Sequence, residues 1–146
     1  MRILLIHGPN LNMLGRRNRA IYGDQTLDEL ESLVVIRAEE LGAEILTFQS
    51  NSEGALIDFI QAKASLAQGV IVNPGALTHY GLSLRDALED SGLPVIEVHI
   101  SDIHAREEWR RNSVIEPIAR KQISGKGAQG YIEALEILVD ESKENR

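Results

Sequence analysis

The sequence predicts an α/β protein with a flavodoxin-like three-layer sandwich around a five-stranded parallel sheet. Short apolar runs alternate along the chain with segments of about 10 to 15 residues in which apolar side chains recur at helical spacing. Gly or Pro stands at most of the junctions, and right-handed crossovers between such runs produce parallel strands covered on both faces. No internal repeat, low-complexity segment or linker interrupts the pattern, so we expect residues 1–146 to form a single domain.

The boundaries of the expected elements follow from apolar periodicity and from the residues that begin and end each run. Ile3 to His7 is continuously apolar, as in a strand buried on both faces, and it stops at Gly8-Pro9. Thr26 and Glu29 have the spacing of a helix-capping box. The charged tail from Asp140 predicts a frayed end. We expect strands at 3–7, 43–48, 69–72, 95–100 and, more weakly, 121–124, with helices at 27–41, 52–66, 82–91 and 130–142.

The composition excludes several classes of function. With 22 acidic and 15 basic residues the formal charge is −7, which argues against a general nucleic-acid binder. The chain has no cysteine, so disulfides, thiolate catalysis, zinc ribbons and iron–sulfur clusters are excluded together. No apolar run reaches the length of a signal peptide or a membrane span. We therefore expect a soluble cytoplasmic protein without a membrane partner.

Chemically capable side chains follow the first predicted strand, at the edge where flavodoxin-like sheets bind ligands. Asn10 comes soon after the strand, and the next loop carries three arginines, at 16, 17 and 19, before Tyr22. This is either a solvated basic loop or a lid over an anion, because neighbouring guanidinium groups repel one another unless negative charge lies close. A cation held beside the Tyr22 phenol would favour the phenolate.

Polar side chains also lie on or after the third and fourth predicted strands. Asn73 is either a turn former or an amide that holds a substrate hydroxyl. Glu97 and His99 are two residues apart on a strand, so they point to the same face. They form either a buried structural pair or a general acid, since a neighbouring carboxylate orients an imidazole and stabilises its protonated form.

The segment after the fourth strand is rich in charge. Arg106 and Arg110 are four residues apart and share a face if the segment is helical. They belong either to an ordinary charged helix face or to a clamp on a ligand's hydroxyl or carboxylate groups.

Two sharper patterns are discounted. Residues 125–130 fit GxGxxG, but only residues 131–146 follow, too few for the closing strand and the acidic ribose partner of a dinucleotide site. Tight packing of a helix on a strand explains these glycines better. His99, Asp102 and His104 match no familiar spacing of metal ligands, so we predict no metal site.

Taken together, these residues match a known family. The chain resembles the type II 3-dehydroquinate dehydratases over nearly its whole length. The matching motifs are GPNLN at 8–12, the loop from Gly15-Arg16-Arg17 to Tyr22-Gly23, QSNSEG at 49–54, NPGALTH at 73–79, LRDAL at 84–88, IEVHIS at 96–101, HAREEWR at 104–110 and GxGxxGY ending at Tyr131.

The resemblance implies one catalytic domain that converts 3-dehydroquinate to 3-dehydroshikimate by anti elimination of water through an enolate, with no metal or other cofactor. By motif, Tyr22 would be the base and Arg17 the cation that favours its phenolate. Asn10 would hold a water near the enolate oxygen. His99, oriented by Glu97, would protonate the departing hydroxyl. Whether the enzyme serves aromatic amino acid biosynthesis through the shikimate pathway or quinate breakdown stays open.

The resemblance also implies a substrate-binding set and an assembly. The residue matching Asp86 reaches the site of a neighbouring subunit in the family, and the assembly is a homododecamer built from trimers. The set that would contact the substrate includes Asn73, His79, Ser101 with the Ile100 backbone, and Arg110, with Arg106 either a partner within the loop or a residue that supports the direct contacts from behind.

The chain departs from the family pattern at three places, none of which removes a chemical role. His7 stands where the family often has Asn, Asn18-Arg19 replaces the common Glu-Pro, and Trp109 stands where Phe is usual.

The competing class is a cofactor-binding or non-enzymatic flavodoxin-like module. A phosphoacceptor receiver needs acidic residues after the first strand and an aspartate after the third, where this chain has Asn10 and Asn73. A flavin carrier needs a Ser/Thr/Gly phosphate loop after the first strand, and this loop carries proline and arginines.

Overall fold

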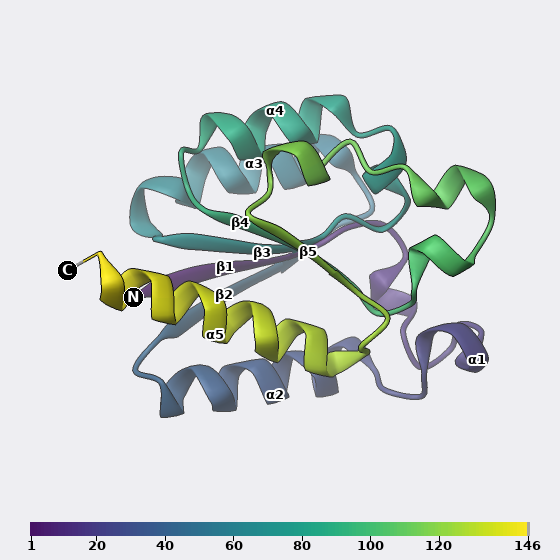
Figure 1. Cartoon of the computed structure of the whole chain (residues 1–146), viewed down its shortest axis with the longest axis horizontal. Coiled ribbons are helices and arrows are strands. Elements are labelled where there is room, and N and C mark those ends of the chain that lie inside the picture. The colour runs from purple at the N-terminus through teal and green to yellow at the C-terminus, as the bar shows by residue number, and fades with distance from the viewer. Residues whose placement is uncertain (146) are drawn as a thin grey trace.

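Five parallel strands form one sheet in a computed structural model that describes residues 1–145. The strand order is β2-β1-β3-β4-β5, the doubly wound arrangement that reverses direction between β1 and β3. The predicted fold class is therefore confirmed (Figure 1). The strands are β1 (Arg2–His7), β2 (Glu44–Gln49), β3 (Gly69–Asn73), β4 (Val95–His99) and β5 (Lys121–Ser124).

Four helices cover the two faces of the sheet. Helices α2 (Leu27–Glu40) and α5 (Ala128–Glu144) lie on one face, and α3 (Glu53–Lys63) and α4 (Leu82–Asp90) lie on the other (Figure 1). Alternate side chains of β1 serve the two cores, because successive residues of a strand point to opposite faces. Ile3 and Leu5 pack toward α2 and α5, whereas Leu4 and Ile6 pack toward α3 and α4.

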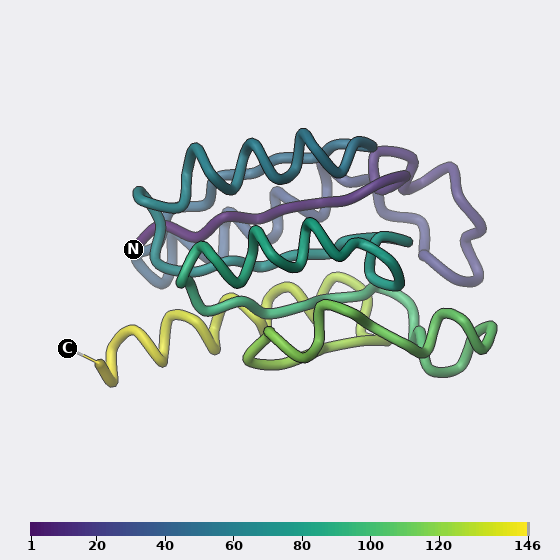
Figure 2. Tube along the Cα trace, turned by 90° about the horizontal axis from the view of Figure 1, so that it is seen from above, coloured from purple at the N-terminus to yellow at the C-terminus, as the bar shows by residue number. Residues whose placement is uncertain are grey.

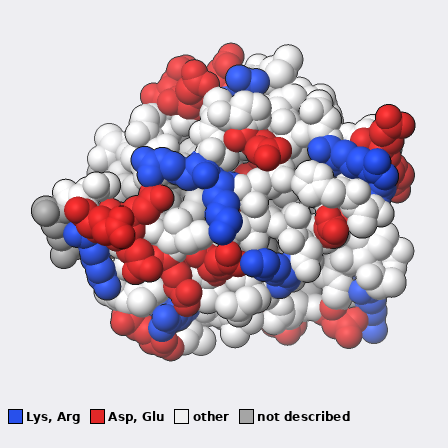
Figure 3. All heavy atoms as spheres, in the orientation of Figure 1, with Lys and Arg blue, Asp and Glu red and all other residues white. Residues whose placement is uncertain are grey.

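Most element boundaries lie within two residues of those expected. The capping box is confirmed, since the Glu29 backbone N–H donates to Thr26 Oγ1 at 3.2 Å. The prediction that the chain is frayed from Asp140 is wrong for residues 140–144, because α5 continues to Glu144. An ion pair of 2.6 Å between Arg120 Nη1 and Glu141 Oε2 ties this last part of the helix to the residue before β5. Acidic and basic side chains are interspersed on this face of the molecule (Figure 3). Arg146 lies outside the described residues.

Two segments extend past the carboxyl ends of the strands (Figures 1 and 2). The first contains a short helix, α1 (Arg19–Tyr22), that periodicity could not reveal; the Asn18 side chain caps it by accepting from the Ala20 N–H at 3.1 Å. The second, after β4, is not one helix. It forms two separate 3-10 turns, Ile103–Ala105 and Glu108–Arg111. Within residues 1–145, no helix is both long and apolar enough to cross a membrane.

The loops after β1 and β3 cross at two glycines. A Cβ on Gly8 would lie 2.2 Å from the carbonyl oxygen of Pro74, and a Cβ on Gly75 would lie 2.8 Å from that of Pro9. Gly75 also has a positive φ of 61°. Each loop thus needs a glycine where it meets the proline of the other.

The glycine pattern at 125–130 serves packing, as the sequence indicated. A Cβ on Gly130 would lie 3.2 Å from Ile123 and 3.3 Å from Val98, side chains of the two strands beneath α5. The glycine therefore lets the helix approach the sheet closely.

Candidate active site

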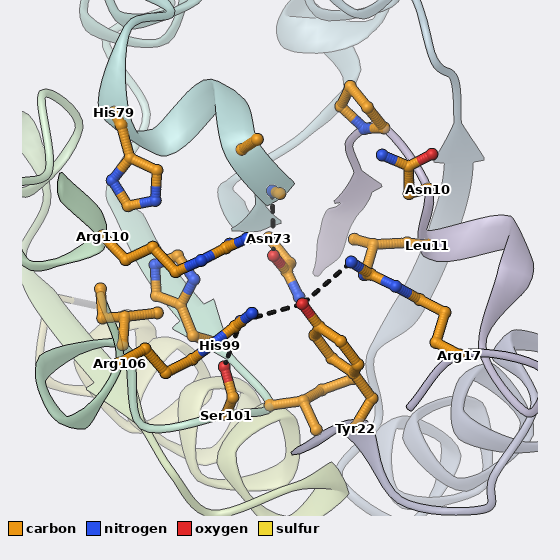
Figure 4. A pocket seen from close by; sticks show the side chains of 15 residues that line it. Asn10, Leu11, Arg17, Tyr22, Asn73, His79, His99, Ser101, Arg106 and Arg110 are labelled. Atoms are coloured by element: carbon orange, nitrogen blue, oxygen red, sulfur yellow. Dashed lines mark hydrogen bonds between the residues drawn. The ribbon is translucent and has the colours of Figure 1, made fainter. Parts of the chain in front are cut away.

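One cavity of roughly 100 Å³ lies at the carboxyl ends of the strands, between the two extended segments (Figure 4). All but two of the predicted site residues line it. Glu97 lies behind His99, and Asp86 is exposed on α4, outside the cavity. The predicted residues around the cavity are Asn10, Arg17, Tyr22, Asn73, His79, His99, Ile100, Ser101, Arg106 and Arg110.

The phenol of Tyr22 lies between two guanidinium groups (Figure 4). Arg17 Nη2 and Arg106 Nη1 each donate to the Tyr22 oxygen at 2.9 Å, and Arg106 also reaches Ser101 Oγ at 3.4 Å. Two cationic donors on one phenol oxygen stabilise negative charge there. Arg106, expected as a loop partner, thus has the same contact distance to the phenol as Arg17.

The arginines of the loop divide between the cavity and the surface. Burial lowers the pKa of Arg17, the Tyr22 phenol opposes this shift, and the Arg106 and Arg110 cations lower the pKa further. Arg16 is exposed and does not line the cavity. Arg19 pairs at the surface with Asp24, its Nε 3.4 Å from Oδ1. The positive charge of the cleft therefore comes from Arg17 and the segment after β4.

Glu97 and His99 form a buried pair, as their spacing predicts. His99 Nε2 lies 2.5 Å from Glu97 Oε2. The carboxylate also accepts from Ser113 Oγ at 2.8 Å and from Gln122 Nε2 at 2.9 Å, so three side chains hold it in place. This arrangement fixes the imidazole and directs its Nε2 proton to the carboxylate. The other ring nitrogen of His99, Nδ1, takes no part in the hydrogen bond to Glu97.

Two partners of Glu97 were missed in the sequence. Gln122 lies on the predicted strand 121–124, but its contact with Glu97 depends on the register of β4 and β5, which the structure supplies. The Oε1 atom of Gln122 lies 2.9 Å from His104 Nε2, so His104 contacts a neighbour of the buried pair. Ser113 lies in an irregular segment where periodicity carries no signal. Within residues 1–145, no three His, Asp or Glu side chains are grouped so that they could hold a metal ion.

His79 is held as a neutral acceptor at the side of the cavity. Its Nδ1 donates to the Asn112 carbonyl at 2.7 Å, so the other nitrogen, Nε2, is the acceptor of the neutral ring. Burial lowers the pKa of His79, the bond to Asn112 opposes this, and the neighbouring His99 and Arg110 side chains lower it further. The ring meets Trp109 edge-on at 5.2 Å. Trp109 also stacks with Arg110, whose Cζ lies 4.1 Å from its ring centroid.

Two asparagines complete the lining. Asn10 has φ 71°, the only positive φ among non-glycine residues 1–145, and its backbone N–H donates to Asn51 Oδ1 at 3.0 Å. Asn73 ends β3; its Oδ1 accepts from the Gly75 N–H at 3.1 Å, and its Nδ2 donates to the Tyr131 hydroxyl at 2.8 Å. Tyr131 was not predicted as part of the site's surroundings.

Comparison with known proteins identifies the family. Residues 1–139 match the model of the family described as dehydroquinase class II. The chain belongs to this family. Among curated relatives, the 3-dehydroquinate dehydratase of Roseiflexus castenholzii is 57% identical over 139 residues, covering 95% of this chain and 88% of the relative. That of Desulforudis audaxviator is 49% identical, covering 96% and 93%.

Solved structures agree with this class II assignment. The type II dehydroquinase of Butyrivibrio crossotus superposes with a TM-score of 0.92 at 44% identity, covering 94% of this chain and 97% of the other. The enzyme of Propionibacterium acnes gives 0.91 at 40% identity, covering 95% and 96%. The resemblance stated from the motifs is confirmed, and the protein is an enzyme of this class.

Proposed function

We propose that this class II dehydroquinase dehydrates 3-dehydroquinate to 3-dehydroshikimate by anti elimination through an enolate, with Tyr22 as base and His99 as acid. One observation carries the proposal: the Tyr22 oxygen is held by two guanidinium groups in the same cavity that contains a carboxylate-oriented histidine. A base and an acid on separate elements suit an elimination that takes a proton from one carbon and releases hydroxide from its neighbour.

The first step is removal of the proton alpha to the ketone. A free phenol has a pKa of about 10, so only about one in a thousand is ionised at pH 7. The two donors at 2.9 Å favour the phenolate, which takes the proton and leaves the electron pair as an enolate. Asn10 lines the cavity on the side of Arg17 (Figure 4) and would hold a water against the enolate oxygen.

The second step is loss of the hydroxyl group. The enolate collapses to the conjugated enone, the carbon–oxygen bond breaks, and the oxygen leaves as water with a proton from His99. The buried Glu97 carboxylate supports the protonated imidazole from which this proton comes. Afterwards Tyr22 carries one extra proton and His99 lacks one, and exchange with water resets both.

The remaining lining groups match a polyhydroxylated carboxylate. His79 offers an acceptor, Asn73 an amide and Arg110 a cation, and Ile100 also lines the cavity. Ser101 lies beside Arg106, on the opposite side of the cavity from Asn10 (Figure 4). We assign these groups to substrate binding.

The test is incubation of the pure protein with 3-dehydroquinate while ultraviolet absorbance reports the conjugated enone. We expect steady turnover that survives exhaustive chelation, since every step above belongs to a side chain. No absorbance rise from a folded protein would refute the activity, and loss of turnover restored by a divalent ion would refute the metal-free route.

We further propose that residues 1–146 act as one cytoplasmic catalytic domain, that twelve chains assemble as a dodecamer built from trimers, and that Asp86 reaches a neighbouring subunit's site. Two facts support the assembly: Asp86 is exposed and does not line its own chain's cavity, and Leu82, on the same helix, is 60% exposed. Light scattering should give a mass of twelve chains. A fully active monomer of 16.2 kDa would contradict the proposal.

A further inference from the structure

A polar cluster, two of whose three members are fully buried, lies behind Asn73, outside the set of residues that line the cavity. It consists of His7 at the end of β1, Glu31 on α2 and Tyr131 on α5. His7 and Tyr131 are fully buried, with 0% of their surface exposed. The mechanism above uses none of the three. Burying polar groups is costly unless their contacts stabilise something, so the cluster requires an explanation.

Tyr131 contacts the site through one hydrogen bond. Its hydroxyl accepts from Asn73 Nδ2 at 2.8 Å, across a sequence separation of 58 residues. The other end of the same amide, Oδ1, accepts from the Gly75 N–H at 3.1 Å. A backbone N–H binds only an oxygen, so these two contacts determine which end of the amide is the donor. One N–H and one lone pair of Asn73 are then left for a ligand.

Tyr131 differs from Tyr22 in its charge. Complete burial raises the pKa of Tyr131 far above its ordinary value, the bond from Asn73 opposes this, and the Glu31 carboxylate adds to the increase. No cation contacts this hydroxyl among residues 1–145, in contrast to the two that hold Tyr22. Tyr131 therefore stays a neutral phenol and cannot serve as a base.

His7 and Glu31 close the cluster on the side of α2. His7 Nε2 lies 3.1 Å from Glu31 Oε1, but within the described chain neither ring nitrogen has a well-directed hydrogen-bond partner. The His7 ring lies 6.1 Å from that of Tyr131, centre to centre, at a tilt of 44°. His7 also pairs in register with Asn73 across β1 and β3. The imidazole thus fills the space beside Tyr131 and restricts where its ring can lie.

We propose that Tyr131 is a positioning residue, which acts through Asn73 by fixing the orientation of its amide toward a substrate hydroxyl. The inference rests on the proposed substrate contact of Asn73. Without the hydroxyl of Tyr131, the Asn73 amide keeps only its bond to Gly75 and samples other orientations, so substrate binds less well.

The test compares Tyr131→Phe, Asn73→Ala and the double variant by steady-state kinetics. Tyr131→Phe removes one oxygen and keeps the ring, and we expect kcat/KM to fall about 3- to 10-fold, mostly through KM. In the Asn73→Ala background the same change should alter kcat/KM by less than about twofold, because the residue through which Tyr131 acts is gone.

A second buried position on α5 separates this role from general stability. Val139 is 4% exposed and makes no polar contact with the cluster, so Val139→Ala should lower the melting temperature and leave KM unchanged. If KM rose as much in Val139→Ala as in Tyr131→Phe, the effect of the Tyr131 substitution would be explained by lost stability alone, and the inference would be overturned.

Two other results would also overturn it. One is an unchanged kcat/KM in Tyr131→Phe beside a large loss in Asn73→Ala; the other is an equal effect of Tyr131→Phe in both backgrounds. If Asn73→Ala itself had no effect, the binding role of Asn73 and this inference would both fail. Turnover by the parent enzyme would still show that the dehydratase activity stands.

Discussion

Arg17 contacts the phenol of Tyr22 in two ways: its Nη2 lies 2.9 Å from the oxygen, and its Cζ lies 3.7 Å from the ring centroid. If the phenolate is the base, Tyr22→Phe removes the only group that takes the substrate proton. We expect kcat to fall by at least about 10²- to 10⁴-fold while the assembly and part of the substrate affinity remain. Substantial turnover in a verified Tyr22→Phe protein would assign the base elsewhere, with His99 the next candidate.

Arg17→Ala should lower the rate and move the rising limb of the pH–rate profile to higher pH. The phenol oxygen loses one of the two guanidinium donors that stabilise negative charge on it. The measurement is kcat against pH for the variant and the parent. Arg16→Ala is the matched control, because it removes the same charge from the adjacent, exposed position outside the cavity. An identical shift in both variants would point to the general field of the loop.

Glu97→Gln should lower kcat by about 10- to 100-fold and destabilise the fold by about 1 to 3 kcal/mol. The carboxylate accepts from His99, Ser113 and Gln122, so an amide of the same shape must turn its NH₂ group toward at least one donor. Kinetics and urea denaturation measure the two effects. Ser113→Ala, which removes one donor and keeps the charge, should retain most of the turnover. Full activity in Glu97→Gln would show that the pair is only structural.

The sequence predicted the contents of the site better than its shape. Glu97 and His99 were paired correctly because alternation on a strand is a local rule. Arg106 was understated, because its contact with Tyr22 depends on how two irregular segments, 84 residues apart, fold over the same edge. Tyr131 escaped prediction for a related reason: as part of an apolar helix face it looks like core, and only the register of α5 over β3 brings its hydroxyl to Asn73.

The stability of the parent enzyme should depend on His79 at mildly acidic pH. Burial lowers the pKa of His79 in the folded protein, while in the unfolded chain it stays near the ordinary value of 6.5. The unfolded state therefore binds the proton first, and the free energy of unfolding falls as the pH drops from about 6.5 toward the lowered value. His79→Asn, which does not titrate, should reduce this slope. Urea denaturation between pH 7.5 and 5.5 measures it, and an unchanged slope would contradict the prediction.

Gly8→Ala should destabilise the protein by about 2 to 4 kcal/mol. The new methyl group would lie 2.2 Å from the Pro74 carbonyl oxygen, and this neighbour is backbone that cannot rotate away. Gly54→Ala is the control: Gly54 lies in α3, its nearest neighbour would be 3.8 Å away, and alanine favours a helix by up to about 1 kcal/mol. Thermal unfolding of the two variants should therefore move in opposite directions.

The guanidinium groups around Tyr22 also determine how a substrate arrives. The chain carries a formal charge of −7, yet Arg17, Arg106 and Arg110 gather at one cleft. An anion diffusing toward this molecule is repelled over much of its surface and drawn to that single opening, so productive encounters are selected before any contact is made. Dissolved ions screen both the repulsion and the attraction beyond about 8 Å at physiological ionic strength. Raising the ionic strength should therefore slow the capture of an anionic substrate.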